Sequence, residues 1–191
     1  MFFESKPMIL LLLGTSGVGK TSVLEYLQTT YSFDSAKKYT TRKPRNSVSD
    51  EKNFIFCNTI DEFPKNKLLV FQSYGNAFGI QIEQIELSIK QGRNHVLIIG
   101  DAETAIKLKN IFPEQIKVVL LYCDYDILKS RIMCDTGRLS RWKTIEREIQ
   151  GIYSWLGVVD YILDCSKQFD ITKTEIDKLI QRINLCSHFD K

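Results

Sequence analysis

Two short stretches of the sequence carry residues whose types and spacing suit phosphate chemistry. The first, Gly14 to Thr21 (GTSGVGKT), fits the pattern G-x-x-x-x-G-K-T without a mismatch. Glycines at these positions let backbone N–H groups turn toward a polyphosphate, and the N-terminus of a following helix adds partial positive charge. Lys20 can reach the β- and γ-phosphates, and the Thr21 hydroxyl can ligate Mg²⁺. The stretch therefore predicts a site for a nucleoside triphosphate and Mg²⁺, with contacts from Gly14, Thr15, Ser16, Gly17, Val18, Gly19, Lys20, Thr21 and Ser22.

The second stretch, Lys37 to Arg45 (KKYTTRKPR), gathers cationic side chains in a short segment. A basic run of this kind is most often a solvated surface, which is the simplest interpretation of the segment on its own. Arginine forks, however, bind a phosphate monoester through two parallel hydrogen bonds. Two anion sites that face each other would hold a phosphoryl donor and an acceptor in line. The cationic residues of the segment are Lys37, Lys38, Arg42, Lys43 and Arg45.

Composition narrows the class of protein. The 191 residues suit one compact domain with a buried core, and 26% charged with 43% hydrophobic residues is ordinary for a globular chain. The formal net charge of +3 is too small to indicate a general nucleic-acid coat. The basic segment is also compact and lacks interleaved aromatic residues on a stacking surface. We therefore expect no nucleic-acid partner.

The patterns of cysteine, histidine and apolar residues indicate the cellular compartment of the protein and whether it binds zinc or a membrane. The cysteines are scattered without a C-x-x-C pair, which favours reduced thiols in a cytoplasm. The two histidines have no Cys or His neighbour at metal-ligand spacing, so we expect no zinc site. The apolar run Met8 to Leu13 lacks a cleavage pattern and leads directly into the glycine-rich loop. Because no apolar stretch approaches ~20 residues, we predict a cytoplasmic protein without a membrane partner.

Short apolar runs alternate with helical patterns along the chain, which is typical of an α/β domain with a parallel sheet. The pattern predicts that the last helix opens with Thr172 and Glu175 at capping-box spacing, and that Gly92 ends an earlier one. The expected strands are Met8–Leu13, Val96–Ile99, Val118–Tyr122 and Tyr161–Leu163, and the expected helices are Lys20–Thr30, Glu83–Gln91 and Thr172–Leu185.

The class of triphosphate-binding protein can be narrowed by elimination. A GTPase would need D-x-x-G and N-K-x-D segments, and the sequence contains neither. A motor protein would usually be longer. A small phosphotransferase remains, and it would use the basic segment as its acceptor site.

Several motifs resemble those of the guanylate kinase family. Thr40 to Arg45 (TTRKPR) matches the family pattern T-T-R-x-P-R, and Gly75 to Gly79 (GNAFG) is similar to G-N-x-Y-G. Val159 to Ile162 (VDYI) resembles the strand near the family's adenine pocket, and the resemblance extends over nearly the whole chain. It implies the nucleoside-monophosphate-kinase type of P-loop domain: a parallel sheet flanked by helices, with core 1–34, 81–133 and 142–191, an acceptor-binding region 35–80 and a lid 134–141.

The resemblance also implies roles for individual residues. Arg42 and Arg45 would hold the acceptor phosphate. Arg138 and one of Arg131, Arg141 or Arg147 would close over the transferring group, where charge matters most in the transition state. A surface role for any single one of these arginines stays open. Asp101 would hold Mg²⁺-bound water or an acceptor hydroxyl, or would cap the helix that follows it.

The sequence departs from the family pattern around the acceptor. Lys38 stands where guanylate kinases have a serine, and Phe54 and Phe78 replace two tyrosines that touch the acceptor phosphate. Leu69 lies near the position of their guanine-reading carboxylate, and Ile80 replaces a serine after the G-N-x-Y-G motif. Each lost hydrogen bond to a charged group is worth ~1.5–3 kcal/mol. We expect Lys38 to offset part of this loss and the acceptor to differ from guanylate kinase's own.

Three hypotheses follow. The first is a Mg²⁺- and ATP-dependent kinase that moves the γ-phosphoryl group to a small phosphorylated acceptor, formally a nucleoside monophosphate. The second is the same chemistry on a phosphorylated sugar, because Lys38 to Arg42 (KYTTR) also resembles a segment of ribose 1,5-bisphosphate phosphokinases. The third is a non-catalytic phospho-ligand binding module, against which the intact Lys20 and Thr21 argue.

Overall fold

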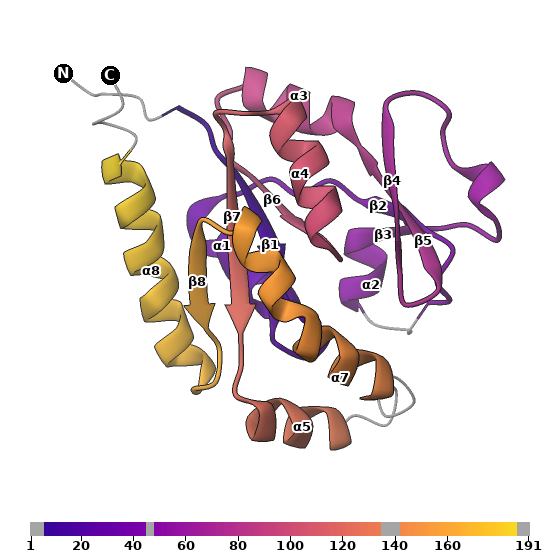
Figure 1. The fold of residues 1–191 in the computed structure, drawn as a ribbon. Coiled ribbons are helices and arrows are strands. Elements are labelled where there is room, and N and C mark those ends of the chain that lie inside the picture. The colour runs from indigo at the N-terminus through magenta and orange to yellow at the C-terminus, as the bar shows by residue number, and fades with distance from the viewer. Residues whose placement is uncertain (1–5, 45–47, 135–141, 187–191) are drawn as a thin grey trace.

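The computed structural model describes residues 6–44, 48–134 and 142–186. Its centre is a four-stranded sheet in the order β6-β1-β7-β8, and every neighbouring pair of strands is parallel (Figure 1). This is the parallel sheet of an α/β fold that the alternating pattern predicts. Its strands are β1 (Ile9–Leu13), β6 (His95–Ile98), β7 (Ile116–Tyr122) and β8 (Tyr161–Asp164).

Helices cover both faces of this sheet. In β1, Leu10 and Leu12 contribute to one hydrophobic core, whereas Ile9, Leu11 and Leu13 contribute to another. All five side chains are buried, which explains why the strand is apolar at every position rather than alternating. The first core packs on α1 (Lys20–Tyr31) and α8 (Phe169–Cys186), and the second packs on α3 (Ile82–Lys90) and α4 (Ala102–Ile111).

A second, smaller sheet lies beside the core sheet (Figure 1). Its strand order is β3-β2-β5-β4, with β2 parallel to β3 and antiparallel to β5, and with β4 and β5 forming an antiparallel hairpin. This sheet is built from the segment that carries the basic cluster. Its elements are β2 (Lys38–Thr40), α2 (Val48–Asn53), β3 (Phe54–Phe56), the 3-10 helix η1 (Ile60–Glu62), β4 (Leu68–Ser73) and β5 (Asn76–Gln81).

The remaining elements follow β7. They are α5 (Tyr125–Met133), α7 (Trp142–Gly151) and the 3-10 helix η2 (Ile152–Val158). The expected lid, 134–141, falls in the chain between α5 and α7. Arg138 and Arg141 there, and Arg45 in the basic segment, lie outside the described residues.

The predicted elements exist, but one predicted cap was wrong. Gly92 has the positive φ of +71° expected of a residue that follows a helix. Thr172, in contrast, lies inside α8, where it is buried and its N–H donates to the Gln168 carbonyl at 3.2 Å. The helix begins three residues earlier because Phe169 packs edge-on against Tyr26, with ring centroids 6.4 Å apart. Tertiary packing thus extends the helix beyond its local capping signal.

A buried histidine of the core sheet anchors the segment that leads into the second sheet. His95 at the start of β6 accepts the Ala36 N–H on Nε2 at 3.2 Å, and its Nδ1 lies 3.2 Å from the Ser88 hydroxyl. Burial lowers the pKa of His95 to about 4, against an opposing attraction from Asp34. Because Nε2 must stay unprotonated to accept the Ala36 N–H, the neutral ring holds the chain where it turns toward Lys38.

This histidine should make the fold sensitive to acid. Its pKa is about 4 in the fold but about 6.5 in the unfolded chain, so the unfolded state binds the extra proton. Stability is therefore lost as the pH falls from 6.5 toward 4, by about 3 kcal/mol in total. Urea denaturation at pH 7 and pH 4 measures the loss. A His95→Gln protein should lose less over this interval; an equal loss would exclude His95 as the cause.

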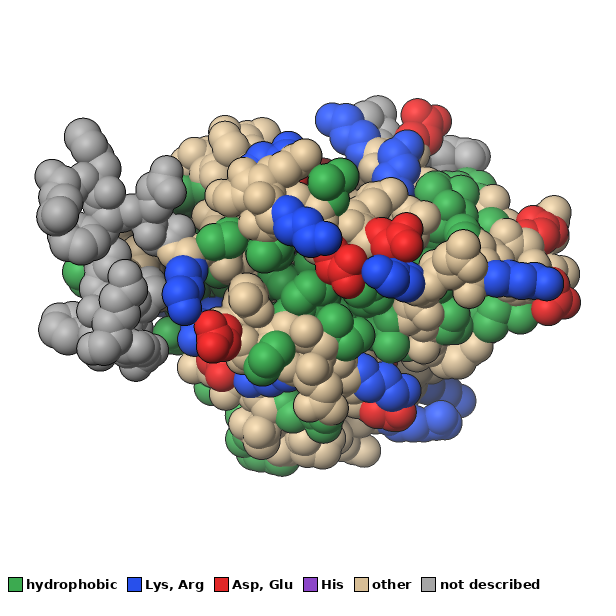
Figure 2. All heavy atoms as spheres, turned by 90° about the horizontal axis from the view of Figure 1, so that it is seen from above, with side chains coloured by type: hydrophobic (Ala, Val, Ile, Leu, Met, Phe, Trp, Pro, Cys, Tyr) green, Lys and Arg blue, Asp and Glu red, His purple; other side chains and the backbone are tan. Residues whose placement is uncertain are grey.

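Charged side chains of both signs lie interspersed among hydrophobic ones on the face shown in Figure 2. No single-sign patch dominates that view, in keeping with the small net charge. Among the described helices, none is both long enough and apolar enough to cross a bilayer.

Candidate active site

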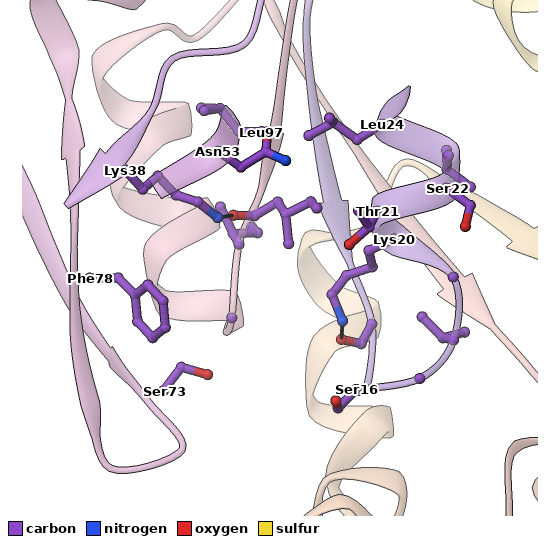
Figure 3. A pocket seen from close by; sticks show the side chains of 18 of the residues that line it. Ser16, Lys20, Thr21, Ser22, Leu24, Lys38, Asn53, Ser73, Phe78 and Leu97 are labelled. Atoms are coloured by element: carbon purple, nitrogen blue, oxygen red, sulfur yellow. Dashed lines mark hydrogen bonds between the residues drawn. The ribbon is translucent and has the colours of Figure 1, made fainter. Parts of the chain in front are cut away.

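A single cleft of about 1310 Å³ contains both stretches singled out in the sequence. One wall is the glycine-rich loop between β1 and α1, and the opposite wall is the second sheet (Figure 3). Lys20 and Thr21 come from the first wall, and Lys38 and Arg42 come from the second. The structure therefore places the two expected anion sites in one shared cavity.

The glycine-rich loop has the backbone shape that its sequence predicts. Gly14, Gly17 and Gly19 all have positive φ, and a Cβ on Gly14 would lie 2.7 Å from the Leu121 carbonyl oxygen. Any other residue at position 14 would therefore clash with β7. The ammonium group of Lys20, the first residue of α1, donates to the carbonyls of Gly14 and Thr15 at 2.6 and 2.7 Å. The loop thus holds this ammonium at the cleft.

Two threonine hydroxyls fix the basic segment on the second sheet. Thr40 Oγ1 donates to the Ala77 carbonyl at 3.1 Å and accepts the Arg42 N–H at 3.1 Å. Thr41 Oγ1 accepts the Ala77 N–H at 2.9 Å, while the Thr41 N–H donates to the Ala77 carbonyl at 3.1 Å. The adjacent threonines lock the backbone that carries Arg42 onto β5. This explains why two threonines must directly precede the arginine.

Arg42 is buried, with 7% of its surface exposed, and it lines the cleft. Its guanidinium carbon lies 4.9 Å from the ring centroid of Phe54 and 5.5 Å from that of Phe56, and Nη1 donates to the Lys43 carbonyl at 2.9 Å. Aromatic faces attract cations and stiffen a long side chain. The fork is therefore held in a fixed place by packing and hydrogen bonds.

Three phenylalanine rings, Phe54 and Phe78 from the family comparison and Phe71 beside them, form an apolar wall of the cleft. The rings of Phe54 and Phe78 lie 6.2 Å apart, and Phe71 stacks on Phe78 at 5.4 Å. All three line the cleft. They supply apolar surface and no hydrogen-bond donor, so a ligand here must find its polar partners elsewhere.

Lys38 supplies a second buried cation on this side. Its Nζ donates to the Ile98 carbonyl at 2.7 Å and lies 5.2 Å from the Phe54 ring centroid. Burial, reinforced by the charges of Lys20 and Arg42, lowers the pKa of Lys38 to about 7. Lys38, Arg42 and Lys20 are therefore close enough to repel one another across the cleft.

The other predicted site residues are placed as follows. Arg131 on α5 lines the cleft, donating to the Lys167 carbonyl at 3.4 Å, whereas Arg147 on α7 is exposed. Asp101 takes the capping role: its carboxylate accepts the Thr104 N–H at 2.7 Å and the Thr104 hydroxyl at 2.8 Å, at the start of α4. Asp101 is not among the residues that line the cleft.

Sequence reasoning missed several residues of the cleft, and two of them, Tyr74 and Glu148, make polar contacts between its walls. Tyr74, at the turn between β4 and β5, accepts the Ser16 N–H of the glycine-rich loop at 3.2 Å and donates to the carboxylate of Glu148 on α7. Burial raises the pKa of Glu148, although the Tyr74 hydroxyl and the charge of Lys20 oppose the shift. These contacts join the second sheet, the loop and α7. Only Tyr74 had a signal, since it directly precedes the Gly75–Gly79 motif.

Two positions compared with guanine-reading residues do not line the cleft. Ile80 is fully buried, and Leu69 is partly buried against the same core. Both therefore pack within the protein rather than facing a ligand.

The donor set suits a triphosphate with Mg²⁺. Within the part of the chain that the structure describes, no three His, Cys, Asp or Glu side chains group together as a metal cage. The Thr21 hydroxyl faces the cleft beside Lys20 (Figure 3). Mg²⁺ commonly binds through few protein ligands, with substrate phosphates and waters completing its shell. A hydroxyl beside a phosphate-binding loop fits that mode.

Comparisons with known proteins agree with this geometry. The chain is 30% identical over 157 residues to the guanylate kinase of Clostridium acetobutylicum, covering 76% of this chain and 74% of that protein. It is 25% identical over 195 residues to the guanylate kinase of Clostridium tetani, covering 94% and 93%. No family model matches the chain.

Solved structures show the same fold. The crystal structure of guanylate kinase from Anaplasma phagocytophilum superposes with a TM-score of 0.72 at 18% identity, covering 96% of this chain and 89% of that one. A gluconokinase from Sinorhizobium meliloti superposes with a TM-score of 0.62 at 16% identity, covering 97% and 98%.

Proposed function

Since this chain belongs to the guanylate kinase family, we propose that it is a P-loop kinase that transfers the γ-phosphoryl group of ATP to a nucleoside monophosphate such as GMP. ATP is the donor, Mg²⁺ its companion ion, and the acceptor a small phosphomonoester. The observation that carries the proposal is the shared cleft: Lys20 of the glycine-rich loop and Arg42 of the basic segment line one cavity.

On the donor side, the loop amides and Lys20 would bind the β- and γ-phosphates, and Thr21 would be the protein ligand of Mg²⁺. When bound, Mg²⁺ neutralises charge that develops on the phosphate oxygens. Arg131 also lines the cleft, where it donates to the Lys167 carbonyl at 3.4 Å, and it would approach the donor. Preorganised cations of this kind stabilise a phosphoryl-transfer transition state without reorganising during the reaction.

On the acceptor side, Arg42 would hold the acceptor phosphate in line with the γ-phosphoryl group, with Lys38 and the Phe54 and Phe78 rings beside it. Arg45, Arg138 and Arg141 are proposed as further phosphate ligands by the resemblance alone. Asp101 is engaged with Thr104, so any contact with the acceptor would require this cap to open.

The second candidate, a phosphorylated sugar as acceptor, is favoured by one observation. Leu69 and Ile80 pack into the core and do not line the cleft. A guanine ring leaves its N–H donors unpaired wherever no acceptor faces them, which costs ~1–3 kcal/mol for each donor.

The experiment that tests the function is an ADP-release assay with Mg²⁺-ATP and a panel of acceptors: GMP, dGMP, AMP, dTMP and ribose 1,5-bisphosphate. We expect a nucleoside monophosphate to stimulate ADP release most, and a Lys20→Ala protein to show no stimulation. Stimulation by ribose 1,5-bisphosphate alone would select the sugar kinase. If no acceptor stimulated ADP release, the proposed function would be wrong.

A further inference from the structure

The ammonium group of Lys38 is unusual in the cleft because it is buried without a carboxylate partner among the described residues. Lysine is almost never fully buried unless it is paired. Yet 93% of this residue is shielded from solvent, and the structure gives its ammonium one hydrogen bond, to the Ile98 carbonyl. In the described part of the chain no carboxylate forms an ion pair with it.

Among the described residues, the charged groups that act on Lys38 are cationic, and the other groups it contacts are neutral. Lys20 comes from α1 and Arg42 from the segment after β2, while β6 offers the Ile98 carbonyl and β3 the face of the Phe54 ring. Two carboxylates in this part of the molecule are occupied elsewhere. Glu148 accepts from Tyr74, and Asp101 accepts from Thr104.

A bound anion would compensate this buried positive charge. An ammonium has three donors, and the carbonyl of Ile98 takes one of them. Lys38 extends from the second sheet toward the loop that carries Lys20 (Figure 3). Because Lys38 lines the cleft, its remaining N–H donors are available to a ligand bound there. Phe54 and Phe78, which stand where guanylate kinases have tyrosines, offer a phosphate no hydroxyl group.

We propose that Lys38 is an acceptor-binding residue whose ammonium grips the phosphomonoester dianion together with Arg42, in place of phenol hydroxyls. This inference rests on the proposed function for the identity of the acceptor, but its test does not require turnover. An ammonium at this position also couples acceptor binding to proton uptake, which phenol hydroxyls would not do. Binding takes up a proton, because the bound dianion favours the charged form of Lys38.

The sign and size of this linkage follow from the pKa. Free Lys38 has a pKa of about 7, and the dianion raises it. Above pH 7 the free protein is mostly neutral at Lys38 and must be protonated to bind, so the acceptor Kd should rise about tenfold per pH unit. Proton uptake should be about half a proton at pH 7 and about 0.9 at pH 8.

Isothermal titration calorimetry measures this uptake directly. GMP and ribose 5-phosphate are titrated without ATP at pH 8 in HEPES and in Tris, whose ionisation enthalpies differ. A phosphomonoester with a second pKa of about 6 is already a dianion at pH 8, so it contributes no proton of its own. Both probes should show the same uptake if the phosphate, rather than the base, engages Lys38.

Variants separate Lys38 from the other groups. Lys38→Arg keeps the charge at every pH and should bind without proton uptake, and Lys38→Met should bind about ten- to a hundredfold more weakly, also without uptake. Lys37→Arg is the matched control, because Lys37 is the adjacent residue and is exposed. It should behave as the wild type.

Several results would overturn the proposal. These are the absence of uptake in the wild type at pH 8, uptake that persists in Lys38→Arg, or failure of both phosphomonoesters to bind. If Lys38→Arg did not fold, judged by thermal unfolding, the slope of the wild-type Kd between pH 7 and pH 9 would still decide. Proton uptake without ADP release in the acceptor assay would refute the kinase function while leaving the Lys38 site intact.

Discussion

Replacement of Lys20 by alanine is expected to reduce kcat for phosphoryl transfer by roughly a thousandfold or more. The ammonium lies at the first turn of α1, held by the carbonyls of Gly14 and Thr15 at 2.6 and 2.7 Å. It is therefore already in place to meet charge that develops on the transferring group. Steady-state ADP release at saturating ATP and acceptor measures the loss.

Two further variants show whether the loss is chemical. Lys20→Arg keeps the charge but presents a planar fork to a site built for a compact ammonium, so it should recover little activity. Lys107→Ala removes an exposed lysine of α4 that pairs with Glu103 on the surface, and it should turn over as the wild type does. A Lys20→Ala protein with near wild-type kcat would contradict the assignment of the loop as the donor site.

The core of the fold could be predicted because its signals are local. Strands such as β1 are apolar at every position and lead directly into turns or caps, so their existence is visible in a few residues. The boundaries shift where packing adds residues that local rules do not count. The start of α8 at Phe169, set by contact with Tyr26, is the clearest case.

The second sheet could not be predicted element by element. β2 and β3 contain three residues each, and β2 pairs with β5, which lies far along the chain. Such short strands carry too little pattern to be distinguished from loops. The functional motif was visible all the same, because the TTR motif predicts Arg42 as a site residue. The structure adds that both threonine hydroxyls bond to Ala77.

The missed residues of the cleft have a common physical cause. Tyr74 meets Ser16 across 58 positions of the sequence and Glu148 across 74. Although Tyr74 itself directly precedes the Gly75–Gly79 motif, its partners cannot be read from the sequence, because each contact depends on how the second sheet and α7 come together at the loop. Lys38 is the opposite case. Its position in the basic segment was evident, but its burial under Phe54 required the structure.

Replacement of Arg42 by alanine should raise the KM for the acceptor by about 10²- to 10⁴-fold, since a bidentate phosphate contact contains two charged hydrogen bonds of ~1.5–3 kcal/mol each. The KM for ATP should change little, because Arg42 stands on the wall opposite the glycine-rich loop. The measurement is a pair of saturation curves, with the best acceptor of the panel varied at fixed ATP and the reverse.

Two further variants distinguish a dedicated acceptor site from a general effect of positive charge. Arg42→Lys keeps a charge over the Phe54 ring but loses the fork, so it should recover only part of the acceptor affinity. Lys37→Ala, in the same basic segment but exposed, should leave both KM values unchanged, because a solvated cation contributes little to a buried site. If Arg42→Ala raised both KM values equally, or if Lys37→Ala were as damaging, the segment would act through general charge. The cleft would then lack a dedicated acceptor pocket, and in-line transfer between its two walls would have no structural basis.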